Sequence, residues 1–191
     1  MTPELKAFIS TYADFTASEI AHISEKFKSR EVKKKEFLLR EGEVCNDIIF
    51  VQSGCLRLYY IADGVETSVW FSFSNSSAID IYSFISEKPS VYFIQAIENS
   101  VVLVLPKPAL NKLYHEVPKM EGMMRRFWED VVINLLERFN SLQNLSADQR
   151  YLDLLKKPGY MQNIPQKYLA SFIGITPTSL SRVKKKTARV K

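Results

Sequence analysis

Residues 164–183 carry the pattern that most restricts how this chain can fold. Apolar side chains recur there at helical spacing in two short groups, Leu169 with Ile173 and Leu180 with Val183. At 3.6 residues per turn, each group lies on one side of its own helix. The sequence therefore predicts two short helices that share one core.

A tight turn is predicted between these two helices. Ala170 is small enough to let the helices approach closely, and Gly174 can adopt a positive φ at little cost. Thr176 suits the N-cap of the second helix, and Pro177 suits its first turn. This arrangement is typical of a helix-turn-helix, whose second helix enters the DNA major groove. The alternative is an αα-hairpin that binds nothing.

The second predicted helix carries the candidate DNA contacts. Three side chains near its start would face base edges, and Arg182 is the long donor among them that can grip guanine with two hydrogen bonds. Nearby lysines would contact phosphates, which supply affinity without sequence information. The expected base-reading set is Thr178, Ser181 and Arg182, and the expected phosphate set is Lys167, Lys184, Lys185 and Lys186.

Charge is unevenly distributed along the chain. Residues 146–191 hold ten lysines and arginines and two acids, which gives +8, whereas residues 1–145 carry a net charge of −3. A basic segment on a mildly acidic body indicates one region that faces double-stranded DNA. The triplet Lys33–Lys35 lies between Glu31 and Glu36, so we interpret it as an ordinary solvated run.

Length and composition set modest bounds on the class of protein. A chain of 191 residues can hold one medium domain and one small one. No apolar run approaches the roughly 18 residues of a transmembrane helix, and the N-terminus lacks the layout of a signal peptide. The two cysteines, Cys45 and Cys55, are expected to stay reduced. A cytoplasmic protein without a membrane partner is predicted.

The sequence contains no motif of an enzyme or of a cofactor site. It has no glycine-rich phosphate loop, no nucleophile elbow and no His-Glu-x-x-His helix. His22 and His115 are isolated, and no histidine or cysteine cluster has zinc spacing. An iron–sulfur cluster needs about four thiolates, and the chain has two cysteines. We therefore expect neither catalysis nor a metal nor another cofactor.

Between residues 36 and 105 the hydrophobic period changes to two. Short segments rich in β-branched and aromatic residues are separated by turn residues, which favours an antiparallel sandwich, jelly roll or barrel. A helix is predicted before this region, because Thr16 and Glu19 have the spacing of a capping box. The predicted strands cover residues 37–39, 48–51, 56–60, 67–71, 91–95 and 101–105.

A long helix is predicted over residues 119–145. Five apolar residues follow one another at intervals of four and three, as in the seam of a coiled coil: Trp128, Val132, Leu135, Phe139 and Leu142. An adjacent face carries Met120, Met124, Phe127 and Val131. We expect one face to pack on its own β-domain and the other on a second copy, giving a homodimer. A single wide stripe facing the core is the alternative.

These elements, in this order, resemble the Crp/Fnr superfamily of bacterial transcription regulators. The segments 39–43 and 49–58 are similar to the family's glycine-punctuated first strands, and Ala170, Gly174 and Arg182 fall on its small, turn and base-reading positions. The resemblance implies an α+β fold in three parts. These are a sensor domain with an N-terminal helix and an antiparallel cyclic-nucleotide-binding-like β-roll or jelly roll (1–115), a dimerisation helix (116–145) and a small all-α helix-turn-helix DNA-binding domain (146–191).

The resemblance also points to an effector pocket in the β-roll. Family members that bind cyclic AMP use a glycine, a glutamate and an arginine, whereas this chain has Ile79, Asp80 and Ser90 at the corresponding places. A phosphate without a cation there would lose most of its stabilisation, so cyclic AMP is not expected. The pocket would hold an unidentified small-molecule effector or be a filled core. Its candidate residues are Trp70, Ile79, Asp80, Tyr82, Ser90 and Leu135.

Two functions follow from these patterns. The first is a dimeric DNA-binding transcription regulator of Crp/Fnr type. The second is an interaction or sensor module of cyclic-nucleotide-binding fold that does not read DNA sequence. The second is favoured by the five residues 187–191 that follow Lys186, because they leave no room for the family's β-hairpin wing. The first is favoured by the exposed basic run beside the turn.

Overall fold

The computed structural model describes residues 2–157 and 159–188, and it divides the chain into two compact units. The first unit contains residues 1–58 and 71–130, and the second contains residues 59–70 and 131–191. The three predicted domains, 1–115, 116–145 and 146–191, remain a prediction.

Two four-stranded sheets form the β-region, with strand orders β1-β8-β3-β6 and β2-β7-β4-β5. The recorded pairs of β1 with β8, β2 with β7, and β3 with β6 and β8 are all antiparallel. The predicted α+β fold with antiparallel sheets is confirmed. The strands are β1 (Lys28–Val32), β2 (Phe37–Leu39), β3 (Asp47–Ser53), β4 (Cys55–Ala62), β5 (Val65–Phe73), β6 (Ser76–Ala78), β7 (Phe93–Ala96) and β8 (Ser100–Pro106).

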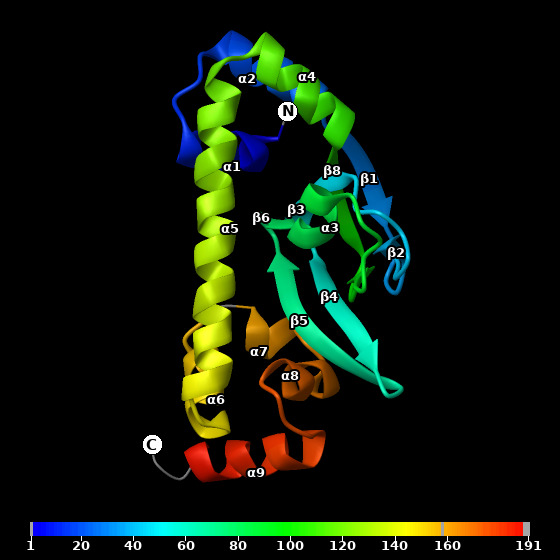
Figure 1. Ribbon diagram of the computed structural model, residues 1–191. Coiled ribbons are helices and arrows are strands. Elements are labelled where there is room, and N and C mark those ends of the chain that lie inside the picture. Colours follow the sequence, from blue (N-terminus) through cyan, green and yellow to red (C-terminus); the bar gives the residue numbers. More distant parts are fainter. Residues whose placement is uncertain (1, 158, 189–191) are drawn as a thin grey trace. The chain divides into compact units, whose positions relative to one another are not determined.

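In the first unit, α1, α2 and α4 lie near one end of the long helix α5, and α3 lies beside the strands (Figure 1). Aromatic contacts join α1 to β3 and to α5, because the ring of Phe8 lies 5.0 Å from that of Phe50 and 6.1 Å from that of Phe127. The predicted capping box of Thr16 and Glu19 is confirmed. The helices are α1 (Pro3–Tyr12), α2 (Ala17–Glu25), α3 (Ile81–Ser86), α4 (Lys107–Glu116) and α5 (Lys119–Asn144), the last of which continues into the second unit.

The turn between β3 and β4 requires glycine for two reasons. Gly54 has a φ of +95°, which side chains rarely adopt, and a Cβ there would lie 2.2 Å from Ser100 Oγ. Ser100 Oγ needs its position because it accepts a hydrogen bond from Cys55 N at 3.2 Å. The close approach of Ser100 therefore leaves no room for a larger residue at position 54.

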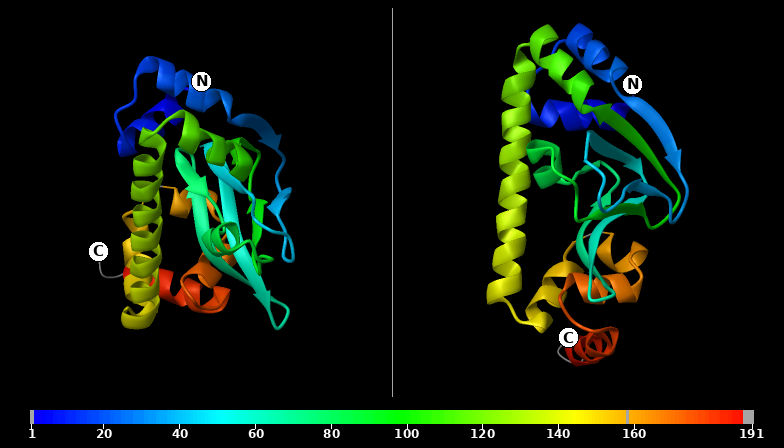
Figure 2. Two further views of the ribbon diagram at one scale, coloured as in Figure 1. Left: turned by 45° about the horizontal axis from the view of Figure 1, so that its top comes forward. Right: turned by 45° about the vertical axis from the view of Figure 1, so that its right-hand side comes forward.

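The second unit combines the tip of a β-hairpin with helices. The strands β4 and β5 run side by side as a long hairpin, and residues 59–70 at its tip belong to this unit (Figure 2). Ser146 forms the N-cap of α6, in a capping box with Gln149. The helices are α6 (Ala147–Leu155), α7 (Tyr160–Asn163), α8 (Gln166–Phe172) and α9 (Pro177–Ala188). Among the described residues, no helix is long and apolar enough to cross a membrane.

Candidate nucleic-acid interface and effector site

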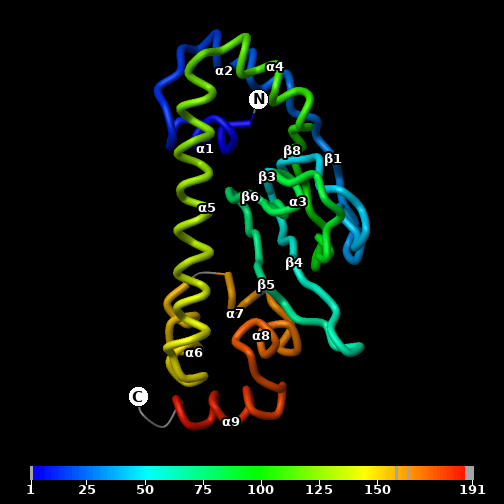
Figure 3. Tube along the Cα trace, viewed as in Figure 1, coloured from blue at the N-terminus to red at the C-terminus, as the bar shows by residue number. Residues whose placement is uncertain are grey.

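The two helices predicted from residues 164–183 are α8 and α9, and they share one core as expected. Leu169, Ile173 and Leu180 are almost completely buried. The chain turns between the helices at Gly174, where φ is +75°, and Ile175 N donates to Ala170 O at 3.0 Å (Figure 3). The turn therefore ends α8, and α9 begins after it as a separate helix.

The start of α9 is capped as the sequence predicts. Thr176 Oγ1 accepts a hydrogen bond from Ser179 N at 3.2 Å, and Pro177 is the first residue of the helix. The three predicted base-reading residues, Thr178, Ser181 and Arg182, are exposed. At 3.6 residues per turn they lie within about 100° of one another, so they form one solvent-facing surface. The three side chains can therefore face the same DNA groove, as base reading requires.

The predicted phosphate-binding lysines have different surroundings. Lys185 is exposed and lies within the arc of the reading face, whereas Lys184 is half-buried on one flank. Lys186, on the other flank, forms an ion pair with Asp148 of α6. Lys167 lies on α8, with its Nζ 4.6 Å from the centroid of the Tyr168 ring. Arg189 and Lys191, which contribute to the +8 of this segment, lie outside the described residues.

Arg150 fixes α8 in place, a role that sequence reasoning missed because it treated this residue only as a charge. Arg150 Nε donates to Ile173 O at 2.8 Å, and Nη1 donates to Leu142 O at 3.3 Å and to Leu145 O. The carbonyls at a helix C-terminus lack intrahelical partners and carry partial negative charge. One guanidinium therefore joins the ends of α5 and α8.

The hairpin tip also holds α8. Ser171 Oγ accepts a hydrogen bond from Ser68 N at 2.9 Å and donates to Ser68 Oγ at 2.8 Å. Two hydrogen bonds to one hydroxyl define the position of this helix relative to β5. No local signal in the sequence links two serines that are 103 residues apart.

The predicted dimer face of α5 is exposed in the single chain. Val132, Leu135, Phe139 and Leu142 are 38–56 % exposed, although they are large and apolar. Trp128 is half-buried and packs on Phe84 and Phe127, with ring centroids 5.7 and 4.8 Å away. The adjacent face, with Met120, Met124 and Phe127, is buried in the first unit.

Asp80 and Ser90 are two predicted effector residues whose side chains are hydrogen-bonded to each other. They are only 3 % and 2 % exposed, and Ser90 Oγ donates to Asp80 Oδ2 at 2.7 Å. Asp80 is the N-cap of α3, and its Oδ1 accepts from Tyr82 N at 3.1 Å and from Ser83 N at 3.3 Å. The chain's own carboxylate thus occupies the donors at the start of α3.

Of the other four predicted effector residues, Tyr82 contributes its backbone N–H to Asp80 Oδ1. Ile79 is half-buried, and the side chain of Tyr82 is exposed, with 60 % of the residue accessible. Trp70 and Leu135 belong to the second unit. Leu135 lies on the exposed face of α5, and Trp70 lines a separate cavity of about 530 Å³.

The two cysteines are free and buried in the first unit. Burial raises the pKa of the Cys55 thiol to about 12 and also raises the pKa of Cys45 above its ordinary value. Both are therefore protonated at neutral pH. Within the described part of the chain, no three histidine, cysteine, aspartate or glutamate side chains are grouped so that they could hold a metal ion.

Comparison with known proteins relates this arrangement to bacterial regulators. Residues 29–116 match the family described as the cyclic nucleotide-binding domain. The regulatory protein HlyX of Actinobacillus pleuropneumoniae is 22 % identical over 160 residues, which cover 84 % of this chain and 63 % of HlyX. The transcriptional activator anr of Pseudomonas aeruginosa is 25 % identical over 128 residues, which cover 67 % of this chain and 52 % of that protein. The chain spans less than two thirds of the length of either relative.

Solved structures share the fold at low sequence identity. FixK2 from Bradyrhizobium japonicum has a TM-score of 0.74 at 14 % identity and covers 85 % of each chain. The c-di-GMP-responsive global regulator CLP of Xanthomonas campestris has a TM-score of 0.72 at 16 % identity, covering 91 % of this chain and 92 % of CLP. The predicted order of β-roll, long helix and helix-turn-helix is therefore confirmed as a fold.

Proposed function

We propose that this chain, which belongs to the Crp/Fnr superfamily, is a dimeric transcription regulator that binds specific DNA sequences through α9. The observation that carries the proposal is the exposed face of Thr178, Ser181 and Arg182 on a helix whose other side is anchored in a helix-turn-helix core. The names of HlyX and anr describe a regulatory protein and a transcriptional activator, which agrees with this role. DNA binding places the protein in the cytoplasm, and no catalytic step is required.

Arg182 is the residue that would read sequence. It is exposed and lies beside Thr178, one helical turn earlier. Its guanidinium can donate two parallel hydrogen bonds to the O6 and N7 of guanine, which is worth about 1–3 kcal/mol of discrimination. Lys185 would contact the phosphates that border the same groove, and Lys186 would do so once DNA competes with Asp148 for its ammonium group.

The exposed face of α5 supports a two-fold dimer. Monomeric proteins rarely leave a contiguous row of large apolar side chains in water. In the dimer, Val132, Leu135 and Phe139 of one chain would meet the same residues of the second. The two recognition helices would then read half-sites about 34–36 Å apart. The divisions at residues 115 and 145 mark the sensor, dimerisation and DNA-binding parts of this proposal.

Cyclic nucleotides are poor candidates for the signal. In the β-roll, the donors at the start of α3 already serve the carboxylate of Asp80, and Ser90 serves the same group. A cyclic phosphate at the start of α3 would meet the buried carboxylate of Asp80, and like charges in a buried site repel strongly. We therefore assign no cyclic nucleotide to this pocket.

The test is a DNA-binding assay on sites selected from random sequence, with salt titrated. We expect a preferred palindrome, and Arg182→Ala should lose about tenfold or more in preference at one position of each half-site. Lys112→Ala, on an exposed residue of α4, is the matched control for a lost positive charge and should bind like wild type. Binding without any sequence preference, or no binding at low salt, would favour the alternative interaction or sensor module.

The dimer has its own test in sedimentation at micromolar concentration. We expect a wild-type dimer and a Phe139→Asp monomer, because aspartate would place a charge in the buried seam. Glu129→Ala, on an exposed residue of the same helix outside the apolar row, should remain dimeric. A monomeric wild type would refute the α5 pairing.

A further inference from the structure

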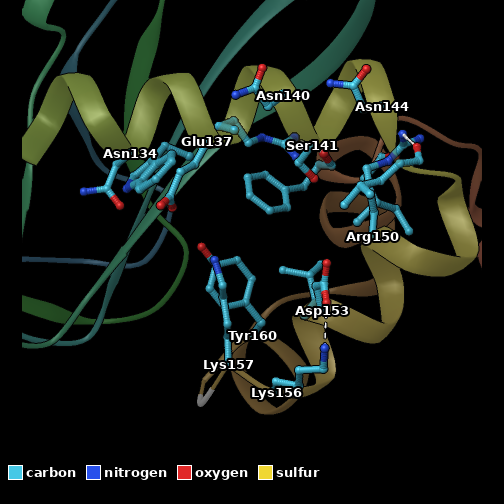
Figure 4. A pocket seen from close by; sticks show the side chains of 16 residues that line it. Asn134, Glu137, Asn140, Ser141, Asn144, Arg150, Asp153, Lys156, Lys157 and Tyr160 are labelled. Atoms are coloured by element: carbon cyan, nitrogen blue, oxygen red, sulfur yellow. Dashed lines mark hydrogen bonds and ion pairs between the residues drawn. The ribbon is translucent and has the colours of Figure 1, made fainter.

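The second unit contains a cavity of about 530 Å³ that the proposed DNA contacts do not use. Its walls come from α5, α6, α7, the end of α8 and Trp70 of β5. Figure 4 shows Glu137 reaching from α5 toward Tyr160, while Asp153 of α6 forms an ion pair with Lys156, the residue that follows this helix. The volume is in the range of sites for small organic ligands, which are commonly 300–1,000 Å³.

Aromatic rings form the apolar part of this cavity. Trp70, Tyr160 and Phe172 all line it, and the rings of Tyr160 and Phe172 are 5.5 Å apart and tilted by 37°. Aromatic walls favour a flat ring, because stacked and edge contacts add to the burial of apolar area. The cavity therefore offers a surface for an aromatic or heteroaromatic group.

The charged lining leaves an excess of positive charge. Six titratable side chains contribute four cations and two carboxylates: Arg138, Arg150, Lys156, Lys157, Glu137 and Asp153. Asp153 is paired with Lys156 at 2.8 Å, and Arg150 is engaged with backbone carbonyls. The remaining charges are those of Arg138, Lys157 and Glu137.

Arg138 has no carboxylate partner among the described residues. Its guanidinium stacks on Phe172, with Cζ 3.8 Å from the ring centroid, and Nη2 donates to Phe172 O. Its Nε is buried and has no acceptor. Burial lowers the pKa of Arg138 to about 10, so the group is still a cation at neutral pH. A half-buried cation of this kind gains stability when an anion approaches it.

We propose that this cavity binds a small organic anion with a flat aromatic or heteroaromatic ring. The ring would contact Trp70, Tyr160 and Phe172, and the anionic group would face Arg138 and Lys157. An aryl carboxylate and a nucleotide share this chemistry. The residues that line this cavity include neither Asp80 nor Ser90 nor any residue of α9, so the proposal does not rest on the proposed DNA binding.

Isothermal titration of the full chain with 1-naphthoate and with 5′-AMP tests the proposal. At least one of these anions should bind with a Kd below about 1 mM. Its neutral counterpart, 1-naphthalenemethanol or adenosine, should bind about tenfold more weakly, since it lacks the charge-assisted contact. Preference for one anion over the other identifies the source as an aryl carboxylate or a nucleotide.

Variants locate the binding at this cavity. Arg138→Gln should abolish it, and Lys157→Glu, which changes an exposed side chain and spares the core, should weaken it about fivefold or more. Lys112→Glu makes the same charge change on α4 and should leave the Kd unchanged. The proposal is overturned if neither anion binds, or if binding survives both Arg138→Gln and Lys157→Glu. DNA binding is measured separately, so either proposal can fail alone.

Discussion

Two helix starts, one in each unit, use the same kind of polar residue to opposite effect. At α3, the Asp80 carboxylate accepts from two backbone N–H groups and from Ser90, and the whole group is buried. At α9, Thr176 caps the helix, and the next turns leave Thr178 and Arg182 in solvent. A capped helix start is therefore a structural device in one unit and the base of a candidate reading surface in the other.

The difference lies in what remains available for a ligand. Around Asp80, the chain satisfies its donors with its own carboxylate, so an incoming anion would have to displace a buried partner. On α9, the exposed donors have lost no water and can exchange it for bases and phosphates. Four predictions test this contrast, from the largest expected effect to the smallest.

Asp80→Ala should give the largest loss of folding stability. It removes an N-cap acceptor and leaves two backbone N–H groups and the buried Ser90 hydroxyl without this partner, which together should lower the free energy of unfolding by about 3 kcal/mol. Urea denaturation measures the change. Glu41→Ala, at an exposed turn, is the control and should shift stability by less than about 0.5 kcal/mol. A change for Asp80→Ala as small as the control would mean that this network is not structural.

Gly174→Ala should destabilise the helix-turn-helix by about 1–2 kcal/mol. The φ of +75° is strained for any residue with a Cβ, although the nearest side-chain atoms are at ordinary contact distance, 3.7 Å or more. Thermal unfolding followed by circular dichroism measures the loss. Gly122→Ala, inside α5 with open space around it, should instead be neutral or slightly stabilising. Equal effects at the two glycines would contradict the role of the turn.

Each lysine of α9 that contacts a phosphate should contribute separately to the salt dependence of DNA binding. Loss of a phosphate contact lowers the slope of log K against log salt by about 0.9, so Lys185→Ala should show this change. Asp148→Asn removes the ion pair with Lys186 and should raise affinity about two- to fivefold, since DNA no longer competes with a carboxylate. An unchanged slope for Lys185→Ala would remove that residue from the interface.

Cyclic AMP and cyclic GMP should leave the Tm of the protein unchanged. A ligand at 100 times its Kd stabilises a protein by about 2.7 kcal/mol, and this is easily seen as a rise in Tm. We expect no rise with either nucleotide, because Asp80 already occupies the donors of α3. A saturable rise that Asp80→Ala abolishes would show that this carboxylate holds the ligand instead of replacing it.

The helix-turn-helix was predictable because its signals are local. The spacing of Leu169, Ile173 and Leu180, the turn at Gly174 and the cap at Thr176 act within about 15 residues, and all are present as expected. The strand run and the long helix were also recognised from periodicity. By contrast, β1 was missed because four of its five residues are exposed and do not alternate, and only its pairing with β8 makes it a strand.

The candidate effector site depended on contacts that the sequence does not contain. The family resemblance grouped six residues, but the tertiary structure joins the side chain of Asp80 to that of Ser90 and assigns Trp70 to the second unit. Arg150 and Arg138 acquire their roles from carbonyls and a ring far along the chain, at Ile173 and Phe172. The sequence alone determined where helices begin, turn and expose charge, because those preferences are set by neighbouring residues. Only the tertiary structure decided which polar groups remain available for a ligand, because satisfaction of a buried donor or charge depends on residues that folding brings together.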